Sequence, residues 1–535
     1  MKKIFLFLTI SLFSIPTMYA VVTWDGTSSE MWTQGTGTEA APYLIETPAN
    51  LAYLSAQVTA GETYSGVYFQ QTEDFDLQSK TWRPIGTSTY KFAGIYNGAN
   101  KYVSNIKTNQ YGLFGITENT KIKNVVLKGT FSASSSYATT SAPLIGEAQG
   151  ITEIFNCHNL ATISENTAIA GLIAKASGNS LLLQHSSNES NIKYVTDCGG
   201  LVGLSAANIT IKNCFNKGNV TAIYSTSTYT ACTATAGGLV GRVGSECDIT
   251  IYQSYNLGNI KASASISSGS SSAFPNVTSC AAGLVGSFSQ GNKGIIKDSY
   301  NRGSITAGTY YSYTYGEERI NAAGLVNGNC DVVACYSNAD ISVTSRYGTT
   351  TGYNYVYKNI FAINNGTLES CYAVGNVNIT SSFVSSLEIN IIPTTASNTY
   401  HNLQSTGGIY KSEEVIKDPS MIPLLNTMGE YFTMDLEGIN DGYPILKWQA
   451  GPRFTITGSC DANRGTVKGG GEYAPGNTAT LTATPKKGCT FVGWSDGVTD
   501  NPRTVTVEGD ATYRAQFIKS SYTIYVNQDC TNYIE

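Results

Sequence analysis

The sequence predicts an all-β protein, most of it a solenoid of stacked coils, followed by a separate small β module. Three observations support this fold class. A short glycine–leucine phrase recurs along the middle of the chain, and alternating apolar and polar residues mark short strands. The composition of the 535 residues, with 54 Gly, 35 Tyr and 13% charged residues, favours strands and turns over helices. The formal net charge of −5 argues against nucleic acid as a partner, because such binding needs a basic surface.

The first element is an export signal. Lys2 and Lys3 precede an apolar stretch over 4–13, and Met18-Tyr19-Ala20 offers a cleavage site. The apolar stretch is too short to span a membrane, and no later stretch is long enough. We therefore expect residues 1–20 to be a signal peptide cleaved near Ala20. The mature chain is expected at the cell surface or in the extracellular medium, without a transmembrane segment.

Residues 21–110 form an N-terminal leader that we expect to cap the solenoid. An open solenoid end exposes apolar core and unpaired backbone groups, and a short helix around 50–58 would cover them. The leader also contains three close acids, Glu73, Asp74 and Asp76. We interpret these acids as solvated turn residues, with a calcium site as the alternative.

Residues 111–400 contain the repeats. The phrase Gly-Leu-hydrophobic-Gly, or a close variant, recurs at intervals of 28 to 45 residues around Leu113, Leu144, Leu172, Leu201, Leu239, Leu284 and Leu325. A second phrase, such as Asn213-Cys214-Phe215-Asn216, follows most copies. A coil of three short strands and three turns needs roughly 21 to 33 residues, so the shortest intervals fit one coil each. We predict that Leu201, Leu239 and Leu284 point inward as a ladder and that the recurrent asparagines lie in turns.

These phrases resemble the GLUG motif of bacterial surface proteins, in which Gly-Leu-hydrophobic-Gly is followed by Asn-Cys/Ser-Tyr-Asn and then Gly-x-Val. The resemblance covers about 111–380 and implies a right-handed parallel β-helix. The copy at Leu172 lacks the second phrase, so an irregular coil is expected there. Residues 401–450, with a helix starting at Ser412-Glu413-Glu414, are expected to close the array as a C-terminal cap.

Residues 451–519 form the separate β module. Alternation over 481–485 and 504–507 predicts strands, and Gly493-Trp494-Ser495-Asp496-Gly497 ends another strand in a turn. The module resembles the divergent internalin-type B repeat, a stalk-like module of bacterial surface proteins. Residues 520–535 begin like this module and are expected to be the start of a truncated second B repeat in a longer parent protein. The alternative is a secreted protein with a degenerate tail.

Catalytic and metal chemistry has few candidates in this sequence. The chain has 3 His, and it contains neither a nucleophile elbow nor a phosphate-binding loop. His158 is interpreted as a tolerated turn or surface residue, and the run Glu317-Glu318-Arg319 as a solvated loop. We therefore predict no catalytic residues, no metal site and no cofactor, and we expect that the protein is not an enzyme.

The 12 cysteines are spread through the chain. Cys330 and Cys335 lack the second pair that a zinc site needs. We expect most cysteines to be buried free thiols that pack as small apolar groups. Cys335 and Cys371 occupy equivalent places in neighbouring repeats, where adjacent strands lie about 4.8 Å apart. A disulfide between these two is a specific alternative.

Four of the longer coils carry insertions, at 224–235, 263–279, 309–319 and 345–358, which are rich in Ser, Thr, Tyr and Gly. Insertions in solenoids collect on one face, often the binding face. The ligand-binding candidates are Tyr310, Tyr311, Tyr313 and Tyr315, as a stacking surface for sugars or a partner protein. The alternative is a long exposed hairpin whose tyrosines pack across strands.

The expected function is that of an adhesin-like protein that recognises host or microbial glycans or surface proteins through the repeat β-helix. Two alternatives remain open: a carbohydrate-active β-helix enzyme, either a polysaccharide lyase or a hydrolase, and a structural spacer or stalk. An aligned trio of acids on one solenoid face would favour the enzyme. A flat face of Ser, Thr and Tyr would favour adhesion.

Overall fold

The computed structural model describes residues 21–134, 139–227, 230–267, 276–289, 292–311, 316–328, 330–347, 354–361, 367–381, 396–402 and 408–520. The chain divides into two compact units, Met1–Phe432 and Thr433–Glu535. The predicted signal peptide at 1–20 lies outside the described residues, as does all but the first residue of the predicted second repeat at 520–535. In the described ranges, no helix combines the length and apolar character needed to cross a bilayer.

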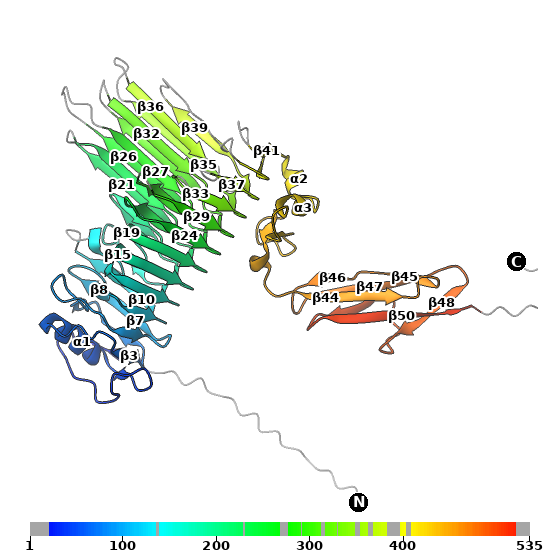
Figure 1. Ribbon diagram of the computed structural model, residues 1–535, viewed down its shortest axis with the longest axis horizontal. Helices are drawn as coiled ribbons and strands as arrows, with labels where there is room; N and C mark the ends of the chain where they lie inside the picture. The colour runs from blue at the N-terminus through cyan, green and yellow to red at the C-terminus, as the bar shows by residue number, and fades with distance from the viewer. Residues whose placement is uncertain are drawn as a thin grey trace, which may run out of the picture. The chain divides into compact units, whose positions relative to one another are not determined.

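The first unit is a parallel β-helix (Figure 1), which confirms the predicted fold class. Two 15-stranded sheets follow its length, and successive coils add neighbouring strands to each. The first solenoid sheet contains β1 (Val22–Thr23), β4 (Phe75–Asp76), β5 (Thr81–Trp82), β7 (Tyr102–Thr108), β10 (Val126–Ala133), β13 (His158–Asn159), β14 (Thr162–Ile163), β16 (Ser187–Asn188), β20 (Phe215–Asn216), β25 (Tyr255–Asn256), β30 (Tyr300–Asn301), β34 (Tyr336–Asn338), β38 (Tyr372–Val374), β40 (Tyr400–His401) and β41 (Ile409–Tyr410).

The second solenoid sheet contains β2 (Tyr43–Ile45), β3 (Tyr68–Gln71), β6 (Ile95–Asn97), β8 (Phe114–Glu118), β9 (Lys121–Lys123), β11 (Ile145–Gln149), β12 (Ile151–Phe155), β15 (Ile173–Gln184), β19 (Val202–Lys212), β23 (Val240–Val243), β24 (Ile249–Tyr252), β28 (Val285–Phe288), β29 (Gly294–Lys297), β33 (Cys330–Val333) and β37 (Leu368–Glu369). The coil with the divergent Leu172 phrase keeps its place in both sheets through β15 and β16. Its irregularity is one register shift between Ser177 and Ser180 in the pairing of β15 with β19.

The repeated leucines form the predicted inward ladder. Leu201, Leu239 and Leu284 are each 0% exposed. Their backbones are linked directly, since the amide of Leu201 donates to the carbonyl of Leu239 at 2.9 Å and that of Leu239 to Leu284 at 2.8 Å. One coil cannot cover its own apolar face, so each leucine is buried by the coils on either side.

The recurrent asparagines serve two purposes. Asn156 and Asn213, which open the repeated phrase, have φ of 52° and lie in left-handed turns as predicted. The asparagines that close the phrase lie on short strands, so the predicted turn position holds for them only in part: the side chain of Asn216 donates to the carbonyl of Gly218 at 2.6 Å, across the turn that follows. Their side chains are 0% exposed and form an internal ladder of amide-to-amide hydrogen bonds of 2.8 Å through Asn159, Asn188, Asn216, Asn256 and Asn301.

A helix buries apolar side chains at the N-terminal end of the described solenoid, and two short helices follow its last strands. The predicted leader helix is α1 (Pro48–Ala60), which begins with a capping box at Thr47 and buries Leu51 and Leu54. Near the other end lie α2 (Glu413–Ile416), at the predicted helix start, and α3 (Met421–Leu425). Phe432 packs 5.8 Å from Tyr372. Tyr372 is the last ring of a stack in the first solenoid sheet that contains Phe215, Tyr255, Tyr300, Tyr336 and Tyr372, with centroids 4.8 to 5.1 Å apart.

The described parts of the insertions form two further parallel sheets, so the alternative of a long exposed hairpin is wrong. The first insert sheet contains β17 (Ile192–Tyr194), β21 (Val220–Thr226), β26 (Ile260–Ile266), β31 (Ile305–Tyr311), β35 (Ile341–Tyr347) and β39 (Val377–Ser381). The second contains β18 (Asp197–Gly199), β22 (Cys232–Gly237), β27 (Val277–Ala282), β32 (Gly316–Ala323) and β36 (Asn354–Phe361). Successive strands of one coil, such as β31 and β32, join different sheets and are not paired as a hairpin.

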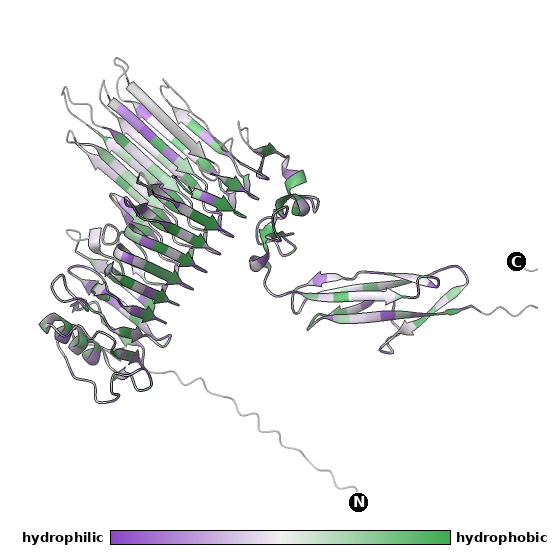
Figure 2. Ribbon diagram, viewed as in Figure 1, coloured by the Kyte–Doolittle hydropathy of each residue, from purple (hydrophilic) through white to green (hydrophobic). Residues whose placement is uncertain are grey.

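The two insert sheets enclose a second hydrophobic core that is distinct from that of the solenoid. This core is rich in small side chains such as Ala222, Ala262 and Ala307. Figure 2 shows the solenoid strands β24, β29 and β33 in green and most of the insert strands in paler shades. The pale shades reflect the alanines, serines and threonines of the insertions, which give a weaker alternation of hydropathy than Ile and Val do.

The cysteines of the solenoid and insert sheets pack as buried thiols. Nine are buried and free: Cys157, Cys198, Cys214, Cys232, Cys247, Cys280, Cys330, Cys335 and Cys371. The alternative of a Cys335–Cys371 disulfide is therefore wrong for this structure. Instead, each of the two thiols lies 3.1 to 3.6 Å from backbone carbonyl oxygens of its own and the preceding coil.

The second unit holds the predicted β module. Before the module come β42 (Phe432–Thr433), whose second residue is the first of this unit, β43 (Ile445–Leu446) and a 3-10 helix (Lys447–Ala450). The module has a four-stranded and a three-stranded sheet made from β44 (Phe454–Cys460), β45 (Gly465–Lys468), β46 (Gly471–Tyr473), β47 (Thr478–Pro485), β48 (Cys489–Trp494), β49 (Arg503–Thr506) and β50 (Ala511–Lys519). Leu481, Trp494 and Phe517 belong to its core. The three strands predicted for this module, over 481–485, before the turn at 493–497 and over 504–507, correspond to β47, β48 and β49.

Candidate ligand-binding face

The four candidate tyrosines belong to the insertion between β31 and β32. Tyr310 lies on β31 and is 40% exposed. Tyr311 ends the same strand, but its side chain is outside the described residues. Tyr313 and Tyr315 are also outside them. One of the four predicted residues can thus be placed, and it is exposed on the first insert sheet.

Tyr310 is part of a broad polar surface that we call the outward face. It is the side of the first insert sheet opposite the alanine-rich core. Its side chains are Thr221, Ile223 and Ser225 on β21, Lys261, Ser263 and Ser265 on β26, Thr306 and Tyr310 on β31, Ser342, Thr344 and Arg346 on β35, and Asn378 and Thr380 on β39, with Gly308 between them. All of them are half-buried or exposed.

The regular rows of this face follow from the alternation within each strand. In β26, with the sequence IKASASI, the side chains of Ile260, Ala262, Ala264 and Ile266 are buried, and the intervening ones face away from the core. The strands stay in register over their whole paired length, so equivalent positions form straight rows across the sheet. Neighbouring strands of the sheet lie about 4.8 Å apart. Within one row the Ser265 hydroxyl donates to Ser225 at 2.9 Å.

The charged side chains of the outward face are positive. The six described strands of the first insert sheet contain no Asp or Glu, whereas Lys193, Lys261 and Arg346 lie on them. Lys193, on the first strand, is bound by Glu165 at 2.8 Å. At the rim, the Asp340 carboxylate accepts hydrogen bonds from the Asn376 backbone at 2.8 Å and side chain at 3.0 Å. The cations at Lys261 and Arg346 therefore dominate the face itself.

A cleft adjoins the outward face where the insert sheet begins. It has a volume of about 480 Å³ and is lined by residues of β14, β17 and β21 with the turns between them. Its wall includes Thr221, at one end of a row of the outward face, and Lys193, which pairs with Thr221 from β17. Its acids are already paired, Glu165 with Lys193 and Glu189 with Lys217, each at 2.8 Å.

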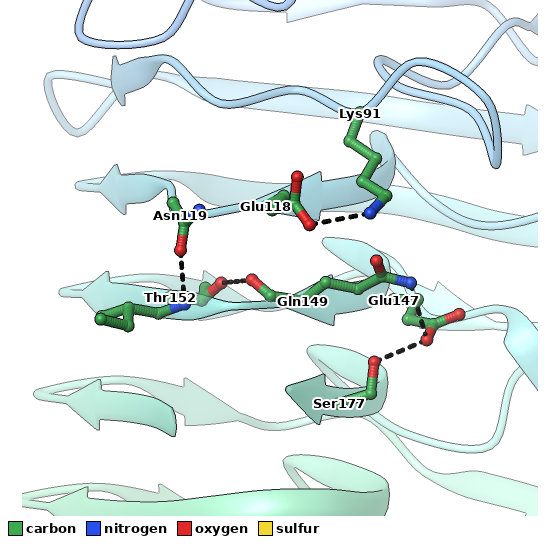
Figure 3. Close-up of polar contacts among 8 residues, drawn as sticks. Lys91, Glu118, Asn119, Glu147, Gln149, Thr152 and Ser177 are labelled. Carbon is green, nitrogen blue, oxygen red and sulfur yellow. Dashed lines mark hydrogen bonds and ion pairs between the residues drawn. The ribbon is translucent and has the colours of Figure 1, made fainter. Parts of the chain in front are cut away.

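Acids on the second solenoid sheet are also paired (Figure 3). Glu118 binds Lys91 at 2.8 Å. Glu147 accepts from the Ser177 hydroxyl at 2.7 Å and from Lys175 at 3.1 Å. Burial acts to raise the pKa of Glu147, but these hydrogen bonds outweigh it, so the pKa lies below its ordinary value. These contacts join one coil to the next, and within the described residues no group of three or more His, Cys, Asp or Glu is placed to hold a metal ion.

The leader acids hold the backbone in place. Asp74 accepts from the amide of Tyr102 at 2.9 Å, and Asp76 accepts from the side chain of Asn105 at 2.9 Å. Glu73 lies 4.0 Å from Lys101. The interpretation as solvated turn residues is therefore only partly right. These acids are half-buried, and they link one coil to the next.

Two other residues singled out in the sequence lie in polar contacts. The two ring nitrogens of His158 lie 2.9 Å from the hydroxyl of Ser187 and from the side-chain oxygen of Asn156. His158 is half-buried on β13, so the prediction of a turn or surface residue holds only in part. Glu318 is not part of a solvated loop, and that prediction is wrong. Its side chain is 0% exposed between the insert sheets and accepts from Ser345 at 2.6 Å.

Sequence reasoning located Tyr310 but missed Lys261, Arg346 and the hydroxyl rows. The signal was present as period-two alternation of Ala or Ile with Ser, Thr or Lys after each Gly-x-hydrophobic phrase. Alanine is only weakly apolar, so a sequence that alternates Ala with Ser or Thr resembles a polar insertion and does not predict a strand with one buried face.

Comparison with known proteins gives three similarities. A protein of Evansella cellulosilytica described as a candidate Gly-rich membrane protein is 33% identical over 115 residues, which cover 19% of this chain and 13% of that protein. The crystal structure of a candidate immunoglobulin A1 protease from Bacteroides ovatus aligns with 78% of this chain and 95% of its own, at 17% identity and a TM-score of 0.31. Residues 455–521, which hold nearly all of the C-terminal β module, match the family model described as the divergent InlB B-repeat domain.

Proposed function

We propose that this protein is exported and acts at the cell surface as an adhesin-like recognition protein that binds glycan or protein ligands without bond chemistry. The observation that carries this proposal is the outward face of the first insert sheet. It is an in-register array of Ser and Thr side chains with Tyr310 exposed on it. Such a surface offers hydroxyl donors and acceptors at fixed spacing together with an aromatic contact, which suits recognition.

The surroundings of the face support a binding role. It rests on a parallel sheet that is backed by its own core and joined to a solenoid fastened by buried amide ladders. A rigid surface loses little conformational entropy when a ligand binds. Enlarging a surface by one strand per coil is also how solenoid proteins build extended binding faces.

The rest of the chain supports a surface location. Residues 455–521 match a B-repeat domain, and the similar protein from Evansella cellulosilytica is described as a candidate membrane protein. The signal-like residues 1–20 and the GLUG-like repeats agree with export. The acids Glu118 and Glu147 already have Lys or Ser partners, which fits a structural role better than acid–base chemistry.

The test is a binding screen of the full mature chain on arrays of purified glycans and extracellular-matrix proteins. Two variants keep the outline of the fold but alter one face each. Ser263→Gln with Thr344→Gln enlarges two outward side chains in the middle row of the outward face. The matched control, Thr210→Gln with Thr250→Gln, enlarges two half-buried, outward hydroxyl residues that are neighbours on the second solenoid sheet.

The proposal expects at least one array ligand to bind the unmodified protein and the control, and to bind the outward-face variant about tenfold more weakly. Circular dichroism checks that both variants are folded. Absence of any glycan or protein ligand, or equal binding by both variants, would overturn the proposal.

A further inference from the structure

The charges on the outward face oppose those of the whole protein. The chain as a whole carries a formal net charge of −5, yet the described strands of the first insert sheet contain cations and no acids. On β26 and β35 the cations are Lys261 and Arg346. No ion pair within the described residues engages either of them. A local excess of one sign on an otherwise acidic protein attracts ligands of the opposite charge.

Arg346 lies beside the exposed aromatic ring. Register places Tyr310 on β31 directly between Ser265 on β26 and Arg346 on β35. Arg346 and Tyr310 are both exposed. A guanidinium next to an exposed ring can receive a carboxylate or sulfate while the ring packs on the apolar face of a sugar.

The second cation is placed for an extended ligand. Lys261 is in the row that continues to Thr306 and Ser342, four positions before Arg346 along the strand and two strands away. From the spacing of strands and residues, the two cations are roughly 16 Å apart across the sheet. Hydroxyl side chains such as Ser263 and Thr344 lie in the row next to this one. This span exceeds a single sugar and fits several linked units.

From this arrangement we infer that the outward face binds an anionic polysaccharide, one with carboxylate or sulfate groups on successive sugars, laid across the strands. This inference rests on the proposed function and specifies its ligand class. Arg346 and Lys261 engage the acidic groups, Tyr310 stacks on a ring, and the Ser and Thr rows bond to sugar hydroxyls.

The test measures binding of the full mature chain to four anionic probes by calorimetry: polygalacturonate, hyaluronate, polysialic acid and dextran sulfate. Methyl-esterified polygalacturonate and dextran are the uncharged counterparts. The test variant is Lys261→Glu with Arg346→Glu. The control, Lys123→Glu with Lys212→Glu, makes the same change of charge on the second solenoid sheet. Tyr310→Ala tests the stacking contact.

We expect at least one anionic probe to bind better than its uncharged counterpart, and more weakly as salt is raised. The double Glu variant should lose at least about tenfold in affinity, Tyr310→Ala should lose several-fold, and the control should stay within about twofold of the unmodified protein. Equal binding by the double Glu variant and the control overturns the inference, as does failure of all four anionic probes. If those probes fail while a neutral glycan or a protein binds at the outward face, the inference is wrong and the proposed function stands. If nothing binds that face, both are wrong.

Discussion

The inward leucine ladder makes a strong prediction for the substitution Leu239→Asp. Leu239 is 0% exposed and lies between Leu201 and Leu284 on adjacent coils. The substitution removes a fully buried side chain and places a carboxyl group in an apolar ladder. We expect it to destabilise the coils around it strongly.

The expected loss of unfolding free energy for Leu239→Asp has two parts. Truncating a buried leucine costs about 2 to 5 kcal/mol through lost transfer energy and a residual cavity. A buried polar group without a partner adds about 1 to 3 kcal/mol, even when the carboxyl takes up a proton to avoid a buried charge. The sum is about 3 to 8 kcal/mol, which is comparable with the whole stability of many domains.

The assay is urea unfolding followed by far-ultraviolet circular dichroism, with amide hydrogen exchange to locate the loss. Exchange matters because coils of a solenoid can open locally. Leu257→Asp is the matched control, since Leu257 lies in the next turn of the same repeat and is 38% exposed. An unfolding midpoint for Leu239→Asp equal to that of Leu257→Asp, with unchanged exchange in β19 and β28, would refute the inward ladder.

Three further predictions concern the buried polar groups. Asn256→Ala leaves the amide of Asn216 and the carbonyl oxygen of Asn301 without their 2.8 Å partners, so it should cost about 2 to 5 kcal/mol; an unchanged urea midpoint would contradict the ladder. Burial raises the pKa of Cys371 to about 12 from an ordinary value of 9.0. The unfolded chain therefore loses this proton first, and the contribution of this one thiol to stability, complete below pH 9, should fall by about 1.4 kcal/mol per pH unit up to about pH 12. Replacing Cys371 by Ala should reduce that slope, and an equal slope would argue against burial. Finally, exported protein unfolded in iodoacetamide without reductant should show both Cys335 and Cys371 alkylated by mass spectrometry; a cross-linked peptide would disprove the free thiols.

The sequence was most informative where one strong physical signal repeats. The leucine of each phrase recurs with large apolar volume, and this alone predicts stacked coils and an inward ladder. In the C-terminal module, clean alternation between residues such as Leu481 and Thr482 was enough to predict the strands. The leader helix was expected because an open solenoid end needs cover, and α1 supplies it.

The sequence was least informative where one residue type serves two environments. Asn213 and Asn216 are three residues apart, yet the first occupies a left-handed turn and the second lies in a buried ladder. The difference arises from pairing with the next coil, which local pattern does not reveal. The prediction of a solvated Glu318 fails for the same reason, because the Ser345 hydroxyl that donates to it belongs to the next coil.

The protein has two separate hydrophobic cores, and this separation determines which substitutions it can tolerate. The leucine and asparagine ladders hold the solenoid, whereas the outward face is backed by a separate alanine-rich core. Substitutions on that face, such as at Ser263 or Thr344, leave both cores untouched. Duplication of one whole coil would widen the face by a single strand, about 4.8 Å, and keep every ladder in register. Such an architecture lets the outward face diversify in chemistry and in reach at little cost to folding.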